Sequence, residues 1–95
     1  MDKILPVGAV VLLEGAEVPL MIIGYQVMGE DKKERDYMGV PYPIGLVSME
    51  VIKGFNHVDI KEILFNGFEN NVLFDNFRKK IVAIKEKTTN NWLNL

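Results

Sequence analysis

The only histidine of the chain, His57, stands two residues before a carboxylate, Asp59, in the stretch Phe55-Asn-His-Val-Asp59. This is the one pairing that resembles an acid–base or metal constellation. A metal site needs three or four converging ligands, and the spacing supplies no third. Two residues apart in one helical turn, the two side chains do not face each other. The pattern therefore favours a structural role for His57, and we expect no metal site, no cofactor and no catalytic residue.

Other signatures of catalysis are weak. Ser48 has no basic partner nearby in the sequence and no glycine elbow around it, so nucleophilic catalysis has little support. The chain has no cysteine, which excludes disulfides, thiolate zinc sites and cysteine nucleophiles. The glycines are dispersed, and none forms a phosphate-cradling loop at a helix start. We expect a non-enzymatic protein, and an enzyme or small-ligand binder that uses the loop around His57 is the outside alternative.

Turn-forming residues set among aromatics fill the central stretch 35–59, which predicts a loop held in one shape by its own packing. The residues expected to structure this loop are Asp36, Gly39, Gly45, Asn56, His57 and Asp59. Its aromatics have two interpretations, a satellite core beneath the loop or a patch that binds a protein partner. The partner-binding candidates are Tyr37, Pro41, Tyr42, Pro43, Phe55 and Trp92, with Phe65 and Phe68 as further aromatics.

Length and charge limit the class of protein. The 95 residues suffice for one domain with a single core, and 48% hydrophobic content is too high for a disordered chain. The net charge of −2 gives no broad positive field for nucleic acid or anionic membranes, and the one basic cluster, Arg78–Lys80, fits a solvated helix face. No run is long enough to span a bilayer, and the start lacks a signal peptide's apolar segment. We expect a cytoplasmic monomer or small homo-oligomer that binds neither nucleic acid nor membrane.

Strand patterns precede one helix pattern. Apolar runs over 7–13 and 18–28, joined by a turn at 14–17, predict a hairpin. Further strands are expected at 36–40, 46–48 and 62–68, with 50–56 as loop or edge strand. The two prolines argue against a central strand over 40–43. Residues 57–61 should form one helical turn capped by Asn56, and 29–35 should be a solvated loop or a charged docking site.

The helix pattern closes the chain. Asn70 or Asn71 can cap its start, and it should fade near Lys87. Its apolar stripe consists of Leu73, Phe77, Ile81 and Ile84. The sequence thus predicts a single α+β domain: 5–68 mainly β, a helix over 70–87 and a tail over 88–95. We expect a small, antiparallel, strongly curled sheet of about five strands, with an SH3-like half-barrel as the favoured variant. The helix should cover this sheet.

Several segments in this order resemble one small bacterial family. They are Leu5-Pro-Val-Gly-Ala-Val-Val-Leu-Leu13, Met21-Ile-Ile-Gly24, Asp36-Tyr-Met-Gly-Val-Pro-Tyr-Pro-Ile-Gly45, Phe55-Asn-His-Val-Asp-Ile60 and Ile63-Leu-Phe-Asn-Gly67. The family is the one catalogued as domain of unknown function 4176, and the resemblance covers roughly residues 5 to 68. It supplies no catalytic residues.

The resemblance also implies a setting. Members of this family occur mostly in Gram-positive bacteria, often encoded among type VII secretion components and toxins with an LXG-type N-terminal domain. It therefore implies a cytosolic, chaperone-like adaptor that binds a secreted toxin or a secretion component. An immunity protein that neutralises the C-terminal domain of a toxin is the alternative from the same setting.

Overall fold

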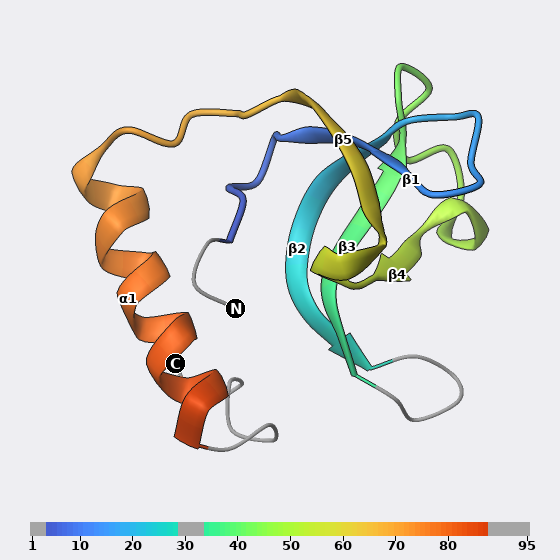
Figure 1. Cartoon of the computed structure of the whole chain (residues 1–95). Coiled ribbons are helices and arrows are strands. Elements are labelled where there is room, and N and C mark those ends of the chain that lie inside the picture. The colour runs from blue at the N-terminus through green and yellow to red at the C-terminus, as the bar shows by residue number, and fades with distance from the viewer. Residues whose placement is uncertain (1–3, 29–33, 88–95) are drawn as a thin grey trace.

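The computed structural model describes residues 4–28 and 34–87, and of residues 26–28 and 82–87 it describes the backbone only. Within these residues, five strands form one antiparallel sheet in the order β4-β3-β2-β1-β5, and one helix follows (Figure 1). The elements are β1 (Val10–Leu13), β2 (Leu20–Met28), β3 (Glu34–Pro41), the 3-10 turn η1 (Met49–Val51), β4 (Lys53–Phe55), the 3-10 turn η2 (His57–Asp59), β5 (Ile60–Phe65) and α1 (Val72–Lys87). The sheet is curled but not closed, which confirms the predicted α+β class.

The hairpin of β1 and β2 starts the sheet, as predicted. The β-branched residues of β1 suit a strand that is covered on both faces, and Val10 and Val11 are both buried. Gly15 has a φ of 77°, which a glycine adopts without strain in the turn between the strands. Val10 lies opposite Met21 in the register, so these two side chains share one face of the sheet.

The proline-containing segment extends the third strand. β3 pairs with β2 through Pro41, whereas β4 lies opposite only residues 37–39 of β3. Val40 and Pro41 therefore belong to β3, and at these two residues β3 pairs with β2 alone. Pro41 has no N–H to donate, but no hydrogen bond to β4 is lost, because β4 does not extend to this residue. The prediction of a strand over 46–48 is wrong, because none of those residues is in a strand and β4, at 53–55, occupies that edge of β3. The edge-strand alternative for 50–56 is thus confirmed.

A single 3-10 turn carries the chain from β4 to β5. It spans His57–Asp59, which is shorter than the predicted turn over 57–61, and Asn56 is its N-cap, as predicted. β5 begins at Ile60, two residues earlier than expected, and returns to pair with β1 on the side away from β2. Glu14 donates its backbone N–H to the carbonyl of Asp59 at 2.9 Å, so the pairing starts directly after the turn. This return of the chain places β5 at one edge of the curled sheet.

The hydrophobic core lies on one face of the sheet. Its buried members are Leu5, Ala9, Val11, Leu13, Leu20, Ile22, Tyr37 and Phe55. Gly39 lies beneath Phe55, where an added Cβ would come within 3.0 Å of both the Phe55 ring and the Met21 carbonyl oxygen. A side chain at position 39 would therefore require the Phe55 ring and the Met21 backbone to give way by a few tenths of an ångström.

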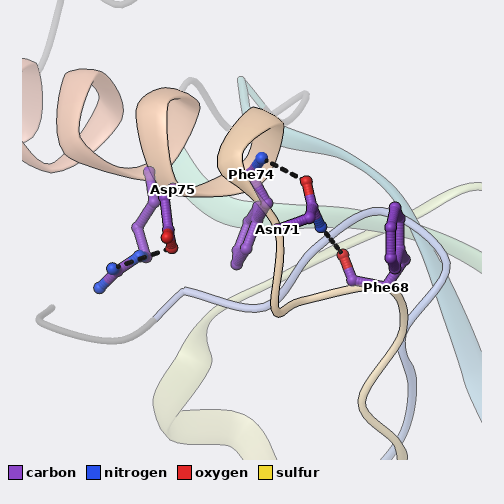
Figure 2. A network of polar contacts seen from close by, with 5 residues as sticks. Phe68, Asn71, Phe74 and Asp75 are labelled. Carbon is purple, nitrogen blue, oxygen red and sulfur yellow. Dashed lines mark hydrogen bonds and ion pairs between the residues drawn. The ribbon is translucent and has the colours of Figure 1, made fainter.

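The cap of α1 is Asn71, one of the two predicted candidates (Figure 2). Its side-chain oxygen accepts the backbone N–H of Phe74 at 2.8 Å, and its side-chain nitrogen donates to the carbonyl of Phe68 at 2.7 Å. The first bond satisfies one of the backbone N–H groups that a helix start leaves without a partner, and the second ties the capping residue to the chain before the helix. On the exposed surface of the helix, Arg78 forms an ion pair with Asp75 at 3.3 Å. Within the described residues, the helix runs from Val72 to Lys87.

The position of α1 differs from the expectation. It stands beside the sheet rather than across it, and the N-terminal segment lies between the two (Figure 1). Phe77 contacts the Tyr25 ring, with ring centroids 5.1 Å apart, and Ile81 is buried. Leu73, expected on the buried stripe, is 80% exposed. The side chain of Ile84, residues 29–33 of the loop predicted over 29–35, and the tail 88–95 lie outside the described residues. The last two residues of that predicted loop, Glu34 and Arg35, belong to β3 instead. Among the residues described, no helix is both long and apolar enough to cross a bilayer.

Candidate functional site

Tyr37 stands at the centre of the candidate site. Its ring is fully buried and lies against the rings of Tyr25, Phe55 and His57, with centroids 6.0, 5.4 and 5.8 Å away. Its hydroxyl oxygen accepts the backbone N–H of Leu5 at 3.1 Å and is hydrogen-bonded to His57 Nδ1 at 2.7 Å. The hydroxyl of Tyr25 donates to the carbonyl of Leu5 at 2.7 Å. Two tyrosines thus satisfy both backbone groups of Leu5, a residue far away in the sequence.

A network of polar contacts extends from His57. We call Asp36, Tyr37, Asn56, His57 and Asp59 the His57 network. Asp36 donates its backbone N–H to the side-chain oxygen of Asn56 at 3.0 Å, and its carboxylate accepts the His57 backbone N–H at 2.9 Å. The Asp59 carboxylate accepts the Asn56 backbone N–H at 2.9 Å. These bonds tie η2 to β3, so the network holds the connection that leads the chain into β5.

The chemistry open to this network is limited. Burial raises the pKa of Tyr25 to about 12 and also raises the pKa of Tyr37, so both hydroxyls stay protonated at neutral pH. The carboxylate of Asp36 accepts the backbone N–H of His57, and that of Asp59 accepts the backbone N–H of Asn56. Within residues 4–28 and 34–87, no group of three or more His, Asp or Glu side chains is arranged to hold a metal ion. The hydrogen bonds of the network connect η2 to β3, which is a structural role.

The burial of two residues corrects the sequence-based list of partner-binding candidates. Tyr37 and Phe55 are core residues, 0% and 2% exposed, because β3 and β4 turn them toward the inner face of the sheet. Neither ring can contact a partner. Trp92 lies outside the described residues. Of the other candidates, Pro41 is partly exposed and ends β3, while Tyr42 and Pro43 are exposed in the turn that follows.

The opposite, outer face of the sheet carries an apolar row across four strands. Phe65 of β5 lies opposite Val10 of β1, Val10 lies opposite Met21 of β2, and Met21 lies opposite Val40 of β3. Residues directly opposite each other share a face, so these side chains run side by side. Val10 and Val40 are buried although they point away from the core.

A groove of about 420 Å³ lies along this row. We call it the outer-face groove, and it is lined by Gly8, Val10, Pro19, Met21, Tyr42, Leu64 and Phe65. Its rim is apolar and open, since Tyr42, Leu64 and Phe65 are 50%, 48% and 60% exposed. Half-exposed aromatic and aliphatic side chains above a buried floor are the usual composition of a protein-binding surface.

The turn after β3 positions Tyr42 on this rim. The Tyr42 N–H donates to the carbonyl of Pro19 at 2.9 Å, which ties the turn to the start of β2. Gly45 closes the turn by donating to the Pro41 carbonyl at 2.7 Å, at a φ of 81° that favours glycine, and the Tyr42–Pro43 peptide bond is cis. Exposed apolar side chains continue through the following loop at Ile44, Leu46, Val47 and Met49.

Sequence analysis missed most of the outer-face groove. Tyr42 was among the candidates and Phe65 among the further aromatics, but Val10, Met21 and Leu64 were not. The pattern of β5, Ile-Lys-Glu-Ile-Leu-Phe, does carry a signal, because its last three residues are apolar and so cannot all lie on one face of a strand. Only the register with β1 shows which of them faces the groove.

A second apolar groove, of about 390 Å³, lies between α1 and the N-terminal segment. Its lining includes Pro6, Tyr25, Phe68, Leu73 and Phe77. Phe68 is 75% exposed on its rim. We call this the helix-side groove, and it provides a matched control for experiments on the outer-face groove.

Comparison with known proteins gives one match. The model of the family described as "Domain of unknown function (DUF4176)" matches residues 4–77, well over half of the chain. No curated protein and no solved structure matches the chain significantly. The matched residues include the His57 network, all five strands and the residues that line the outer-face groove and the helix-side groove.

Proposed function

Because the chain belongs to the family of domain of unknown function 4176, we propose that it is a non-enzymatic adaptor that binds another protein through the outer-face groove. The observation that carries the proposal is the open apolar rim of Tyr42, Leu64 and Phe65 over the buried row of Val10 and Val40. Burial of such side chains in an interface is a main source of binding free energy. The His57 network has a structural part in this proposal, because it holds the turn that leads into β5.

The partner class comes from the family resemblance. We propose that the partner is a secreted toxin of the LXG type, or another component of type VII secretion, bound in the cytoplasm before export. The adaptor would cover apolar surface of the partner with its own apolar rim. This proposal predicts a stable complex and no turnover of a substrate.

The first experiment is a pull-down of the tagged chain from native bacterial cytosol, read by mass spectrometry and followed by size-exclusion chromatography of the purified pair. Stoichiometric recovery of the N-terminal region of a toxin supports the adaptor. Recovery of a toxin's C-terminal domain instead would identify an immunity protein. A chain that returns alone and monomeric would overturn the proposal.

A matched pair of variants then tests the surface. Phe65→Ala removes a rim residue of the outer-face groove, whereas Phe68→Ala removes a ring that is also mostly exposed from the rim of the helix-side groove. We expect Phe65→Ala to weaken the complex about tenfold or more, a hot-spot effect of about 1.4 kcal/mol or more, and Phe68→Ala to leave affinity unchanged. Both variants should unfold within a few degrees of the wild type, since both rings are mostly exposed. The reverse order of affinities would move the binding surface to the helix side.

A further inference from the structure

The helix-side groove is an apolar surface that the proposed function does not use. Its lining residues are all uncharged: Pro6, Val7, Tyr25, Phe68, Asn71, Leu73, Phe74 and Phe77. Two of them, Phe68 and Leu73, are mostly exposed. The groove measures about 390 Å³, which is more than any single side chain fills. Open apolar surface of this kind marks a place where another segment binds.

The residues that follow α1 match this groove in chemistry. Residues 88–95, which lie outside the described residues, read Thr-Thr-Asn-Asn-Trp-Leu-Asn-Leu and contain no charge. Trp92 and Leu93 are adjacent large apolar residues within this stretch. Because neither the groove nor the segment carries a charge, no charged group would lose its hydration when the two come together.

The length of the segment allows it to return along the helix. Phe77 lies ten residues before Lys87, which is about 15 Å along the helix axis. Trp92 lies five residues after Lys87, and five extended residues span about 16–18 Å. The indole side chain adds to this reach. Trp92 can therefore return to the level of Phe77, where the groove lies between α1 and the N-terminal segment (Figure 1).

We propose that residues 88–95 fold back along α1 and that Trp92 and Leu93 occupy the helix-side groove of their own chain. The stretch Thr-Thr-Asn-Asn that precedes Trp92 favours the reversal, because Thr and Asn are weak helix formers and Asn is common in turns. The indole packs beside the Phe77 ring, and the docked segment covers Leu73. The contact also fastens α1 to the N-terminal segment, since both line the groove.

The tether favours this occupant over a separate protein. A segment joined to its site by a few residues meets that site at an effective concentration on the order of 1 mM. A second copy or another protein must displace the segment and also loses translational and rotational freedom when it binds. The inference is independent of the proposed function. It assigns Trp92 to the chain's own groove and leaves the outer-face groove to the partner.

Fluorescence tests the proposal directly, because Trp92 is the only tryptophan of the chain. In the free chain, its emission should be blue-shifted from that of the chain unfolded in urea. Its quenching constant with acrylamide should be several-fold smaller than in the unfolded chain, since an indole in an apolar groove is shielded from the quencher. Emission and quenching equal to those of the unfolded chain would overturn the proposal and would leave the groove open to a separate protein.

Two neighbouring variants locate the indole. Leu73→Glu places a charge in the groove, whereas Val72→Glu places the same charge on the preceding residue, which does not line the groove. Both residues are mostly exposed in the first turn of α1, where a carboxylate suits the helix dipole, so both variants should fold. Leu73→Glu should shift the emission to the red and raise the quenching constant several-fold, and Val72→Glu should change neither. Equal spectra for the two variants would place Trp92 elsewhere and overturn the proposal.

Nuclear Overhauser effects in the unsubstituted chain decide the case even if a variant fails to fold. Docking predicts cross-peaks between the Trp92 indole and the side chains of Phe77 and Leu73. Their absence would overturn the proposal. In a mixture of isotope-labelled and unlabelled chains, these cross-peaks should stay within one chain. Cross-peaks between labelled and unlabelled chains would show that a second copy supplies the segment, which would also overturn the proposal.

Discussion

Replacing Tyr37 by Phe removes one oxygen atom from the centre of the molecule and leaves the ring packing intact. That oxygen accepts the backbone N–H of Leu5 and is bonded to His57 Nδ1. Tyr37 and Leu5 are buried, so water cannot reach the Leu5 N–H to replace the lost acceptor. The variant therefore leaves a buried donor without a partner in the core.

The expected magnitude follows from these contacts. A buried donor that loses its partner costs about 1–3 kcal/mol, and we take about 2 kcal/mol for Tyr37→Phe. For a domain of this size, that lowers Tm by about 8–16 °C. His57→Ala should cost less, about 1 kcal/mol, because Leu5 keeps its acceptor and His57 is partly exposed. The double variant should lose less than the sum of the two, since both substitutions remove the same bond.

Urea and thermal unfolding, followed by circular dichroism, measure these differences. The matched control is Tyr42→Phe, which removes the same atom from a tyrosine that is half exposed, and it should change stability by less than about 0.5 kcal/mol. If Tyr37→Phe unfolds within about 0.5 kcal/mol of this control, the Tyr37 hydroxyl does not tie the N-terminal segment to the core and the reasoning is refuted.

Three further predictions concern pH, packing and the helix cap. Burial raises the pKa of Tyr25 to about 12, so the stability that the protonated hydroxyl contributes is complete below the unfolded pKa of about 10 and is lost as the pH rises toward 12. In Tyr25→Phe, the urea midpoint should therefore fall less steeply between pH ~9 and ~11 than in the wild type. An unchanged slope would contradict this. Gly39→Ala should destabilise the domain by about 1–3 kcal/mol, because the added Cβ would meet the Met21 backbone and the Phe55 ring. Gly24→Ala should cost less, since its Cβ comes close only to the flexible end of the Met38 side chain. Equal urea midpoints for the two variants would show that Phe55 has room to move. Asn71→Ala should lower stability by about 1 kcal/mol through loss of the cap, seen as a lower Tm, and an unchanged Tm would mean that α1 adds no stability to the domain.

Local signals in the sequence were sufficient for the elements that depend on local physics. The hairpin of β1 and β2 follows from β-branched runs around a glycine turn, and the turn capped by Asn56 and the helix capped by Asn71 follow from side chains that bond nearby backbone. These features involve residues only a few positions apart.

Tertiary pairing explains what the sequence did not show. Leu46–Ser48 has a better strand composition than Lys53–Phe55, yet β4 forms at the second segment because Phe55 fits over Gly39 and lies opposite Tyr37. The same pairing buries Tyr37 and Phe55 and removes them from the partner-binding candidates. The outer-face groove depends on the register of four strands, and a shift of one residue would turn its side chains to the other face.

The two sets of residues described here have different consequences when they are altered. The His57 network and Tyr37 hold β3 to the turn before β5, so their substitution lowers stability and, through the position of β5, also affinity. The side chains of Leu64 and Phe65 are about half exposed or more, and a small domain with little surplus stability gains little from leaving them so. The proposed function gives a reason for this exposure, because a bound partner would cover these side chains. Variants of β5 and Tyr42 should accordingly change affinity at constant Tm, and variants of the His57 network should change both together.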